Sequence, residues 1–342
     1  MNRMALGGNK KAVGLEIDAG MARAVEAAGR AGKPKLDNMA VGEIPEGAVD
    51  EGMIVEPREV GTALANLWKK GSLKSRSVML GISNQGVLVR YATIPKVPPD
   101  KLNNVIRFHA QEHLPIPLDS VVMDQQVIGE TVDEEDKTML EVLLVAARRD
   151  MLNGFLEALK LANLEPADID VSTLSLLQTL PSAAIDRTVA VVNVANGLSN
   201  ILVSERGQAR LARLVSVNLG DLAEATGYTL NDVLSINSSG SQEVRDAYTN
   251  WAESLISETR SSLNYYQNQE KSTPLEAIIL NGRGGCLKGI DKLMENALGL
   301  PVRLVNPFAI FTNAAKTTEE LGVQAVEYAI SAGLARRALG GS

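Results

Sequence analysis

Two histidines on one predicted helix could together hold a metal ion. Residues 109–113 have the pattern H-x-x-E-H, in which side chains four residues apart lie on the same helix face. A catalytic zinc needs a third protein ligand, and His109 and His113 are the only histidines of the chain. No spacing in the sequence places a carboxylate beside this helix. We therefore predict exposed polar residues and no metal site, with a zinc metallopeptidase using His109, Glu112 and His113 as an alternative function.

Glycines cluster at 281–285, after a predicted strand, and the turns that end the segments 14–20 and 192–197 also contain a glycine. Backbone N–H groups in turns of this kind can come close to a phosphate. Such glycines also occur in ordinary turns, so the pattern alone does not define a site. The chain contains neither the G-x-x-x-x-G-K-[ST] pattern of a P-loop nor the G-x-S-x-G pattern of a serine hydrolase. The sequence therefore offers no support for these two enzyme classes.

The overall composition is that of a folded protein, and its charge argues against a general nucleic-acid binder. Hydrophobic residues make up 45% of the 342 residues, and a chain of this length is expected to form more than one core. The net charge of −7 opposes binding to nucleic-acid phosphates. Cys286 is the single cysteine, so no disulfide can form within the chain. Residues 1–11 lack the apolar core of a signal peptide. No apolar run reaches the roughly 20 residues that cross a bilayer. We expect a cytoplasmic protein that meets a membrane only through partners.

The chain contains two copies of a three-stranded meander. Short apolar runs between turn residues predict strands at 13–17, 21–28 and 35–44, and again at 188–194, 197–205 and 209–217. A helix with Pro57 in its first turn follows the first copy, and a helix over 241–266 follows the second. Each meander thus has a helix that can cover its sheet, which predicts an α/β protein with two similar lobes.

A further segment between the two copies has its own strand–helix–strand–strand pattern. Its strand candidates are 86–94, 121–128 and 139–147, with an amphipathic helix over 101–113. The remaining predicted elements are helices over 151–161, 290–298 and 323–339 and extended segments over 78–82, 164–171 and 276–280. The pattern predicts a self-contained subdomain inserted into the first lobe.

A series of short segments along nearly the whole chain has the order and spacing of a known family. The most specific are Val105-Ile106-Arg107-Phe108, Pro115-Ile116-Pro117-Leu118, Gln126-Val127 and the run 142–148. The series continues with 161–166, Ile169-Asp170, Gly299-Leu300-Pro301-Val302 and Asn306-Pro307-Phe308. These segments resemble PilM, the actin-like family of type IV pilus systems, which is related to the division protein FtsA.

The resemblance implies an actin-like (ribonuclease H-like) two-lobed α/β fold with the strand–helix–strand–strand insertion in the first lobe. The first lobe is expected at 10–72 and 165–184, with the inserted subdomain at 73–164. The second lobe is expected at 185–226 and 272–340, with a small, mostly helical subdomain at 227–271.

Partner binding is the main activity that the resemblance implies. In this family a groove beside the insertion binds the N-terminal cytoplasmic tail of PilN, a membrane protein. Apolar residues that could line the groove are Phe108, Leu114, Ile116 and Leu118, although the same residues also suit a core. Through PilN the chain would meet the pilus motor ATPases and the inner-membrane platform protein. Its expected place is therefore the cytoplasm, peripheral to the inner membrane.

The resemblance also implies a site for ATP and Mg²⁺ between the lobes. The residues that fall there are Glu16, Asp18, Gly20, Arg23, Asn193, Asn196, Gly197, Gly282, Gly284 and Gly285. Family members resemble Gly-Leu-Asp-Ile-Gly-Ser-Ser in the first segment, so Glu16 replaces an aspartate and Asp18 a glycine. Asn193 replaces the aspartate of the second segment. Because Asp18 adds a negative charge close to the phosphates, we predict a degenerate cleft with weak or absent ATPase activity.

Two main functions remain open at this stage. The first is an adaptor that recruits PilN. The second is a switch of the same machine, in which ATP closes the cleft and changes the groove. An FtsA-like filament former is disfavoured because no separate membrane-targeting helix follows the helix predicted over 323–339.

Overall fold

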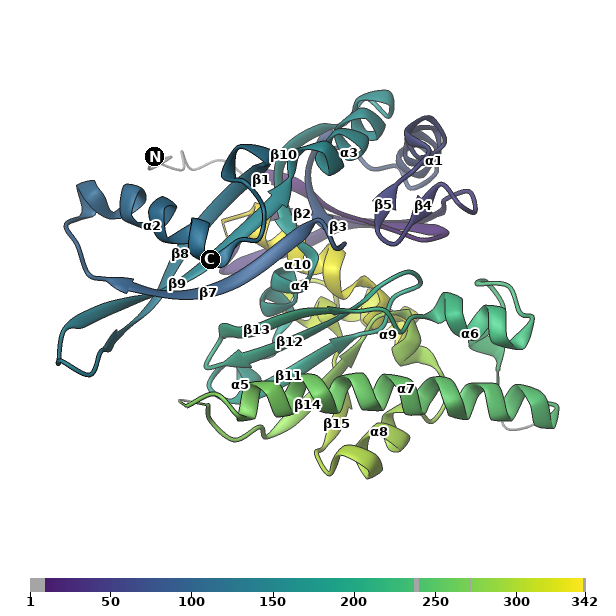
Figure 1. Cartoon of the computed structure of the whole chain (residues 1–342). Coiled ribbons are helices and arrows are strands. Elements are labelled where there is room, and N and C mark those ends of the chain that lie inside the picture. The colour runs from purple at the N-terminus through teal and green to yellow at the C-terminus, as the bar shows by residue number, and fades with distance from the viewer. Residues whose placement is uncertain (1–9, 237–239, 271, 341–342) are drawn as a thin grey trace.

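Each lobe is organised around a five-stranded mixed sheet, and the two sheets have the same strand order (Figure 1). The computed structural model describes residues 10–236, 240–270 and 272–340. The first sheet is formed, in spatial order, by β3 (Lys33–Glu43), β2 (Met21–Arg30), β1 (Lys10–Asp18), β6 (Ser77–Ile82) and β10 (Glu165–Val171). The second is formed by β13 (Gln208–Val215), β12 (Ser199–Glu205), β11 (Thr188–Asn193), β14 (Ala277–Asn281) and β15 (Val302–Leu304). The duplicated architecture is confirmed.

The same pairing pattern builds both sheets. In each, the first three strands pair antiparallel, and the next two run parallel to the first strand. Both faces of each sheet are covered, so the central strands are largely buried, as the six buried residues of β11 show. In β11, Val189 and Val191 face the core between the lobes, whereas Ala190 and Val192 face the helices of the second lobe. This alternation follows from the two-residue period of a strand.

Helices form the outer layers and the layer between the lobes. On the first sheet, α1 (Pro57–Lys70) and α3 (Arg149–Leu161) pack against one another over a core that includes Trp68 and Phe155. On the second, α7 (Gln242–Gln267) and α8 (Ile290–Leu298) cover the outer face. The middle layer contains α4 (Ser172–Ser175), η2 (Leu176–Thr179) and α10 (Ala329–Ala338), which join the two lobes in one core. Figure 1 shows α4 and α10 lying between the sheets.

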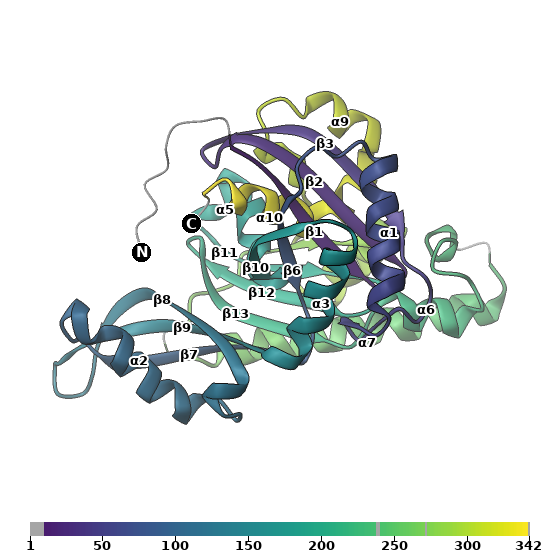
Figure 2. The same cartoon turned by 90° about the horizontal axis from the view of Figure 1, so that it is seen from above.

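The inserted subdomain is a separate three-stranded antiparallel sheet with one helix. It contains β7 (Val87–Pro95), α2 (Pro99–His113), β8 (Val121–Val132) and β9 (Thr138–Arg148), with the strand order β7-β9-β8. Its small core includes Ile94, Ile106 and Leu144. Figure 2 shows the subdomain projecting away from both large sheets.

The structure divides the segment 73–164 that the sequence had assigned to the insertion. Strand β6 lies between β1 and β10 in the first sheet, and α3 packs on α1 of the first lobe. The reason is visible in the burial of their side chains. Five of the six residues of β6 are buried, as a strand covered on both faces requires, and the apolar face of α3 joins the first-lobe core.

The remaining elements are short connections. They are β4 (Val49–Asp50), β5 (Met53–Ile54), η1 (Leu118–Ser120), α5 (Ser182–Ile185), α6 (Leu219–Thr226), η3 (Val233–Ser235), η4 (Arg283–Cys286), η5 (Pro307–Ile310), α9 (Ala315–Leu321) and η6 (Gly322–Tyr328). The helix predicted over 323–339 therefore begins as the 3-10 helix η6 and continues as α10. Within the described ranges, none of the helices combines the length and apolar character needed to cross a membrane.

Candidate functional site

The turn between β1 and β2 meets the turn between β11 and β12 where the two lobes face each other, and the carboxylate of Asp18 joins the two turns. Its Oδ2 accepts a hydrogen bond from the backbone N–H of Asn196 at 2.8 Å. Its Oδ1 accepts hydrogen bonds from the N–H of Gly197 at 3.0 Å and from that of Ala19 at 2.8 Å. The N–H groups that the sequence predicted to face a phosphate thus face a carboxylate of the same chain.

The two turns also touch directly. The side-chain amide of Asn196 donates to the carbonyl oxygen of Ala19 at 2.8 Å. A Cβ atom added to Gly197 would lie only 3.2 Å from Ala19 Cβ and from Asp18 Oδ1. Glycine is therefore needed at 197 for the close approach of the two turns, rather than for approach to a ligand.

A network of buried charges lies behind the turns. Glu16 and Arg23 are register partners on β1 and β2, with 6% and 2% of their surface exposed. An Nη2 hydrogen of Arg23 is donated to Glu327 Oε2 at 3.0 Å, and Arg283 Nε lies 3.9 Å from the same oxygen. Arg283 also donates to Asn196 Oδ1 at 3.4 Å. The network thus links both lobes and η6.

Burial raises the pKa of two acids between the lobes, Glu16 and Asp18. Burial raises the pKa of Glu16 to about 8, against the opposing charge of Arg23 and with the support of the Asp18 and Glu327 charges. Burial also raises the pKa of Asp18, while the N–H bonds to its carboxylate and the charge of Arg23 oppose that rise. With a pKa of about 8, the Glu16 carboxyl is mostly protonated at neutral pH.

Amides occupy the ends of the two central strands of the second sheet. Asn193 of β11 and Asn281 of β14 are register partners, and both are almost fully buried. Asn193 Nδ2 and Asn281 Oδ1 have no hydrogen-bond partner among the described residues. Neither side chain supplies the charge with which a carboxylate holds Mg²⁺.

The glycines of the third segment pack against the second turn. Gly282 has φ +76° and ψ 174°, and a Cβ atom there would lie 2.4 Å from the carbonyl oxygen of Val194. A Cβ on Gly284 would lie 2.3 Å from Val194 Cγ1, whereas one on Gly285 would have more space, at 3.3 Å from Leu304 Cδ2 and 3.5 Å from Leu280 Cγ. Their close contacts are with the protein's own chain.

These residues do not fit the phosphates of ATP or a bound Mg²⁺. The N–H groups of Asn196 and Gly197 already donate to Asp18. Glu16 is mostly protonated, and Asn193 carries no charge, so neither replaces the aspartates of the family pattern. The structure brings the predicted residues of the first two segments together, but their polar groups bind each other.

Three residues of this cleft were not among the predicted site residues. They are Asn281, Arg283 and Glu327. Asn281 and Arg283 belong to a glycine-rich segment that was singled out for its glycines alone. Glu327 lies about 300 residues from Arg23 in the sequence, and no local pattern connects them.

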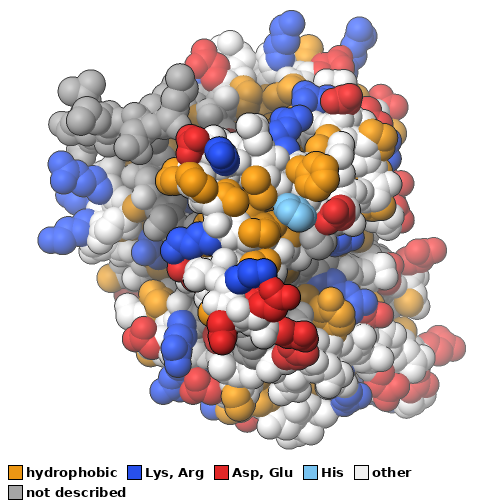
Figure 3. Space-filling model, turned by 60° about the vertical axis from the view of Figure 1, so that its left-hand side comes forward, with side chains coloured by type: hydrophobic (Ala, Val, Ile, Leu, Met, Phe, Trp, Pro, Cys, Tyr) orange, Lys and Arg blue, Asp and Glu red, His pale blue; other side chains and the backbone are white. Residues whose placement is uncertain are grey.

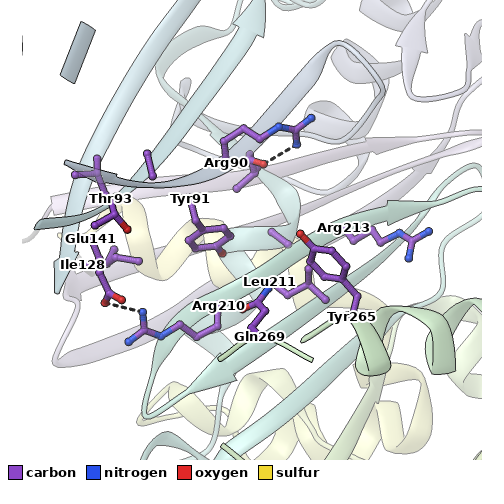
Figure 4. A pocket seen from close by; sticks show the side chains of 14 residues that line it. Arg90, Tyr91, Thr93, Ile128, Glu141, Arg210, Leu211, Arg213, Tyr265 and Gln269 are labelled. Carbon is purple, nitrogen blue, oxygen red and sulfur yellow. Dashed lines mark hydrogen bonds and ion pairs between the residues drawn. The ribbon is translucent and has the colours of Figure 1, made fainter. Parts of the chain in front are cut away.

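A cavity of about 720 Å³ lies between the inserted subdomain and the second lobe (Figure 4). The inserted side consists of β7, β8 and β9, and the opposite side of β13 and the end of α7. A smaller cavity of about 160 Å³ extends to Ser83 and Val171 of the first lobe, and it shares four lining residues with the larger one: Val89, Arg90, Ala212 and Arg213. Together they form a groove where all three parts of the molecule meet, which we call the β7–β13 groove.

One ion pair crosses the β7–β13 groove. Arg210 Nη1 of β13 donates to Glu141 Oε2 of β9 at 3.0 Å, as the dashed line in Figure 4 marks. The ring of Tyr91 points into the cavity, and its hydroxyl has no hydrogen-bond partner among the described residues. Burial raises the pKa of Tyr91 above its usual range.

The four apolar residues predicted to bind a partner do not line this groove. Phe108 is 67% exposed on α2, whereas Leu114 is 6% exposed and belongs to the core of the insertion. Ile116 and Leu118 are half-buried and pack against that core. Figure 3 shows orange side chains gathered around a single pale blue histidine on this side of the molecule. Phe108 contacts His109, with ring centroids 5.6 Å apart.

The H-x-x-E-H pattern lies at the end of α2. His109 Nδ1 is 3.2 Å from Glu112 Oε2, and the His113 side chain lies outside the described residues. Across the described parts of the chain, no three His, Cys, Asp or Glu side chains are grouped so that they could hold a metal ion.

Comparison with known proteins agrees with this architecture. Residues 14–216 and 238–339 match the family described as type IV pilus assembly protein PilM. The chain is similar to the solved PilM-PilN type IV pilus biogenesis complex, with 25% identity, a TM-score of 0.82 and coverage of 98% of this chain and 100% of that chain.

Two more distant structures share the fold. One is the ethanolamine utilization protein EutJ from Carboxydothermus hydrogenoformans, with 12% identity, a TM-score of 0.55 and coverage of 98% and 91%. The other is MreB5 of Spiroplasma citri bound to ADP, with 10% identity, a TM-score of 0.50 and coverage of 92% and 98%. The predicted actin-like, two-lobed fold is thus confirmed. Because the family match extends over both lobes and the insertion, the chain belongs to the type IV pilus assembly protein PilM family.

Proposed function

We propose that the chain is an adaptor of the type IV pilus assembly platform that binds the N-terminal cytoplasmic tail of PilN. The observation that carries this proposal is the likeness, over 98% of the chain, to the solved PilM-PilN type IV pilus biogenesis complex. In this role the protein is cytoplasmic and reaches the inner membrane, the platform protein and the motor ATPases through partners.

The β7–β13 groove is the site that we assign to the peptide. Strands β7 and β13 are the edge strands of their sheets, and consecutive residues of each line the cavity, 89–93 and 210–213. An edge strand offers unpaired N–H and C=O groups with which an extended peptide can pair. Apolar side chains of the peptide would then lie against Leu211 and Ile128, which line the same cavity.

The proposed adaptor has a degenerate nucleotide cleft. Its support is that Asp18 occupies the N–H groups of the second turn and that Glu16 is mostly protonated. The competing function is a nucleotide-dependent switch, and it requires ATP to displace the Asp18 carboxylate. The further proposal that Phe108 contacts a partner is supported by its exposure on α2.

The proposal is tested by titrating the protein with a synthetic PilN N-terminal peptide in a calorimeter. Replacing Ala212 by tryptophan fills the part of the groove that both cavities share, so we expect peptide affinity to fall about tenfold or more. The matched control is Ala297→Trp, an exposed position on α8 at the far edge of the second sheet, and its affinity should equal that of the wild type. Thermal unfolding of both variants checks their folding. Equal affinity in folded Ala212→Trp would show that the peptide does not bind in this groove.

A further inference from the structure

We propose that Asp18 acts as a built-in substitute for a nucleotide phosphate, so that the cleft between the lobes is closed by the chain itself. This inference concerns the cleft and is independent of whether a peptide binds in the β7–β13 groove. It rests on three features of the described residues: the donors that Asp18 engages, the space around it and the state of the nearby cations.

The donors are those of an anion-binding turn. Consecutive backbone N–H groups, of Asn196 and Gly197, donate to the two different oxygens of one carboxylate, at 2.8 and 3.0 Å. Successive N–H groups that converge on an anion are the arrangement by which glycine-rich turns bind phosphate. The carboxylate comes from the other lobe, 178 residues away from Asn196 in the sequence. A single charged side chain therefore makes the contacts across the cleft that a phosphate would make.

The space around Asp18 leaves no room for a second anion between the turns. Asn196 Nδ2 is bonded to the Ala19 carbonyl at 2.8 Å, and the Cβ position of Gly197 is 3.2 Å from Asp18 Oδ1. A phosphate could enter only if these contacts opened. Asp18 and a phosphate would then compete for the same donors.

The cations that could attract a phosphate are already paired. Arg23 donates to Glu327 at 3.0 Å, and Arg283 lies 3.9 Å from the same carboxylate. Arg283 donates in addition to the side-chain oxygen of Asn196. Glu327 and Asp18 supply two negative charges beside these two arginines, and Glu16 next to Arg23 is mostly protonated, so this region has no surplus of positive charge. In this arrangement the closed position of the two turns is a property of the sequence and needs no nucleotide.

Amide hydrogen exchange at Asn196 and Gly197 tests the proposal. In Asp18→Ala these two amides lose their acceptor, and we expect them to exchange about tenfold faster or more than in the wild type. Inorganic phosphate at about 50 mM should slow the exchange again in this variant, because it can take the place of the carboxylate. About 5 mM ATP with Mg²⁺ should leave both amides unchanged in the wild type.

The matched control is Asp133→Ala. The Asp133 carboxylate also accepts two backbone N–H groups, those of Glu135 and Lys137, in an exposed turn of the insertion. This variant should speed exchange in its own turn and leave Asn196 and Gly197 unaffected. The proposal is overturned if Asp18→Ala does not change the two amides, if phosphate fails to slow them in that variant, or if ATP slows them in the wild type. The ATP experiment uses only the wild type, so it can overturn the proposal even if Asp18→Ala does not fold.

Discussion

Replacing Arg23 by methionine is expected to lower the free energy of unfolding by about 3–5 kcal/mol near pH 8. The guanidinium is almost fully buried, donates to Glu327 at 3.0 Å and lies opposite Glu16 on the neighbouring strand. Methionine fills a similar volume but leaves the buried Glu16 without its neighbouring cation and Glu327 with only Arg283, at 3.9 Å. Such a loss costs far more than that of an exposed pair, because the remaining charges cannot be solvated. Urea denaturation followed by circular dichroism measures this change in the free energy of unfolding.

The pH dependence of this loss identifies Glu16 as one of the groups involved. Its pKa is raised from 4.5 to about 8 in the folded protein, so between these values the folded state binds more protons than the unfolded state. The stability of the wild type therefore falls as pH rises through this window. Near pH 5.5 Glu16 is neutral in the folded protein, and Arg23→Met should cost clearly less than near pH 8.

The control for Arg23→Met is Arg148→Met. Arg148 forms an ion pair with Asp150 in which both side chains are largely exposed, and exposed pairs contribute roughly 0–1 kcal/mol. Equal losses in the two variants would mean that the Arg23 network does not stabilise the fold. If the loss of unfolding free energy in Arg23→Met did not change with pH, Glu16 would not interact with Arg23 as described.

Replacing Gly282 by alanine is expected to destabilise the protein by at least about 3 kcal/mol. Its backbone, with φ +76° and ψ 174°, lies in a region that almost only glycine adopts. The added Cβ would also lie 2.4 Å from the carbonyl oxygen and 2.8 Å from the nitrogen of Val194. Backbone atoms of a central turn cannot move aside without breaking the hydrogen bonds of the second lobe. Urea denaturation of Gly282→Ala and the wild type, without any ligand, therefore measures the loss of stability.

Gly289→Ala is the matched control for this prediction. Gly289 also has a positive φ, +87°, but nothing lies within 4 Å of an added Cβ. Its substitution carries only the backbone cost of about 1–2 kcal/mol. If the two alanine variants were equally stable, close packing on Val194 would not be the reason for glycine at 282.

Helices and strands could be predicted from the sequence where apolar residues recur with a single helical or strand period. The paired meanders and α8 lie where the apolar patterns placed them, since each pattern describes burial on the faces of one element. The insertion boundary could not be found this way. The strand at 77–82 precedes β7 closely in sequence, and only its pairing with β1 and β10 assigns it to the first lobe.

The sequence predicted that the two turns lie between the lobes, but it did not predict the contacts that the turns make. Sequence alone indicated that Asp18 would repel phosphates, but not that its carboxylate would bind the N–H groups of the other lobe. That contact depends on how two distant turns are brought together. Glu327 is the clearest case, because its role depends on η6 lying against β2. Leu114 shows the opposite limit, since its apolar character suited both a groove and a core, and the structure places it in the core.

We propose that the chain recruits PilN without the help of a nucleotide. The most direct test is calorimetric titration with the PilN N-terminal peptide, performed once without nucleotide and once with about 5 mM ATP and Mg²⁺. We expect binding in both titrations, with Kd values equal within about twofold, because a ligand that does not bind cannot shift the equilibrium. No binding at high micromolar peptide, or binding only when ATP is present, would contradict the claim.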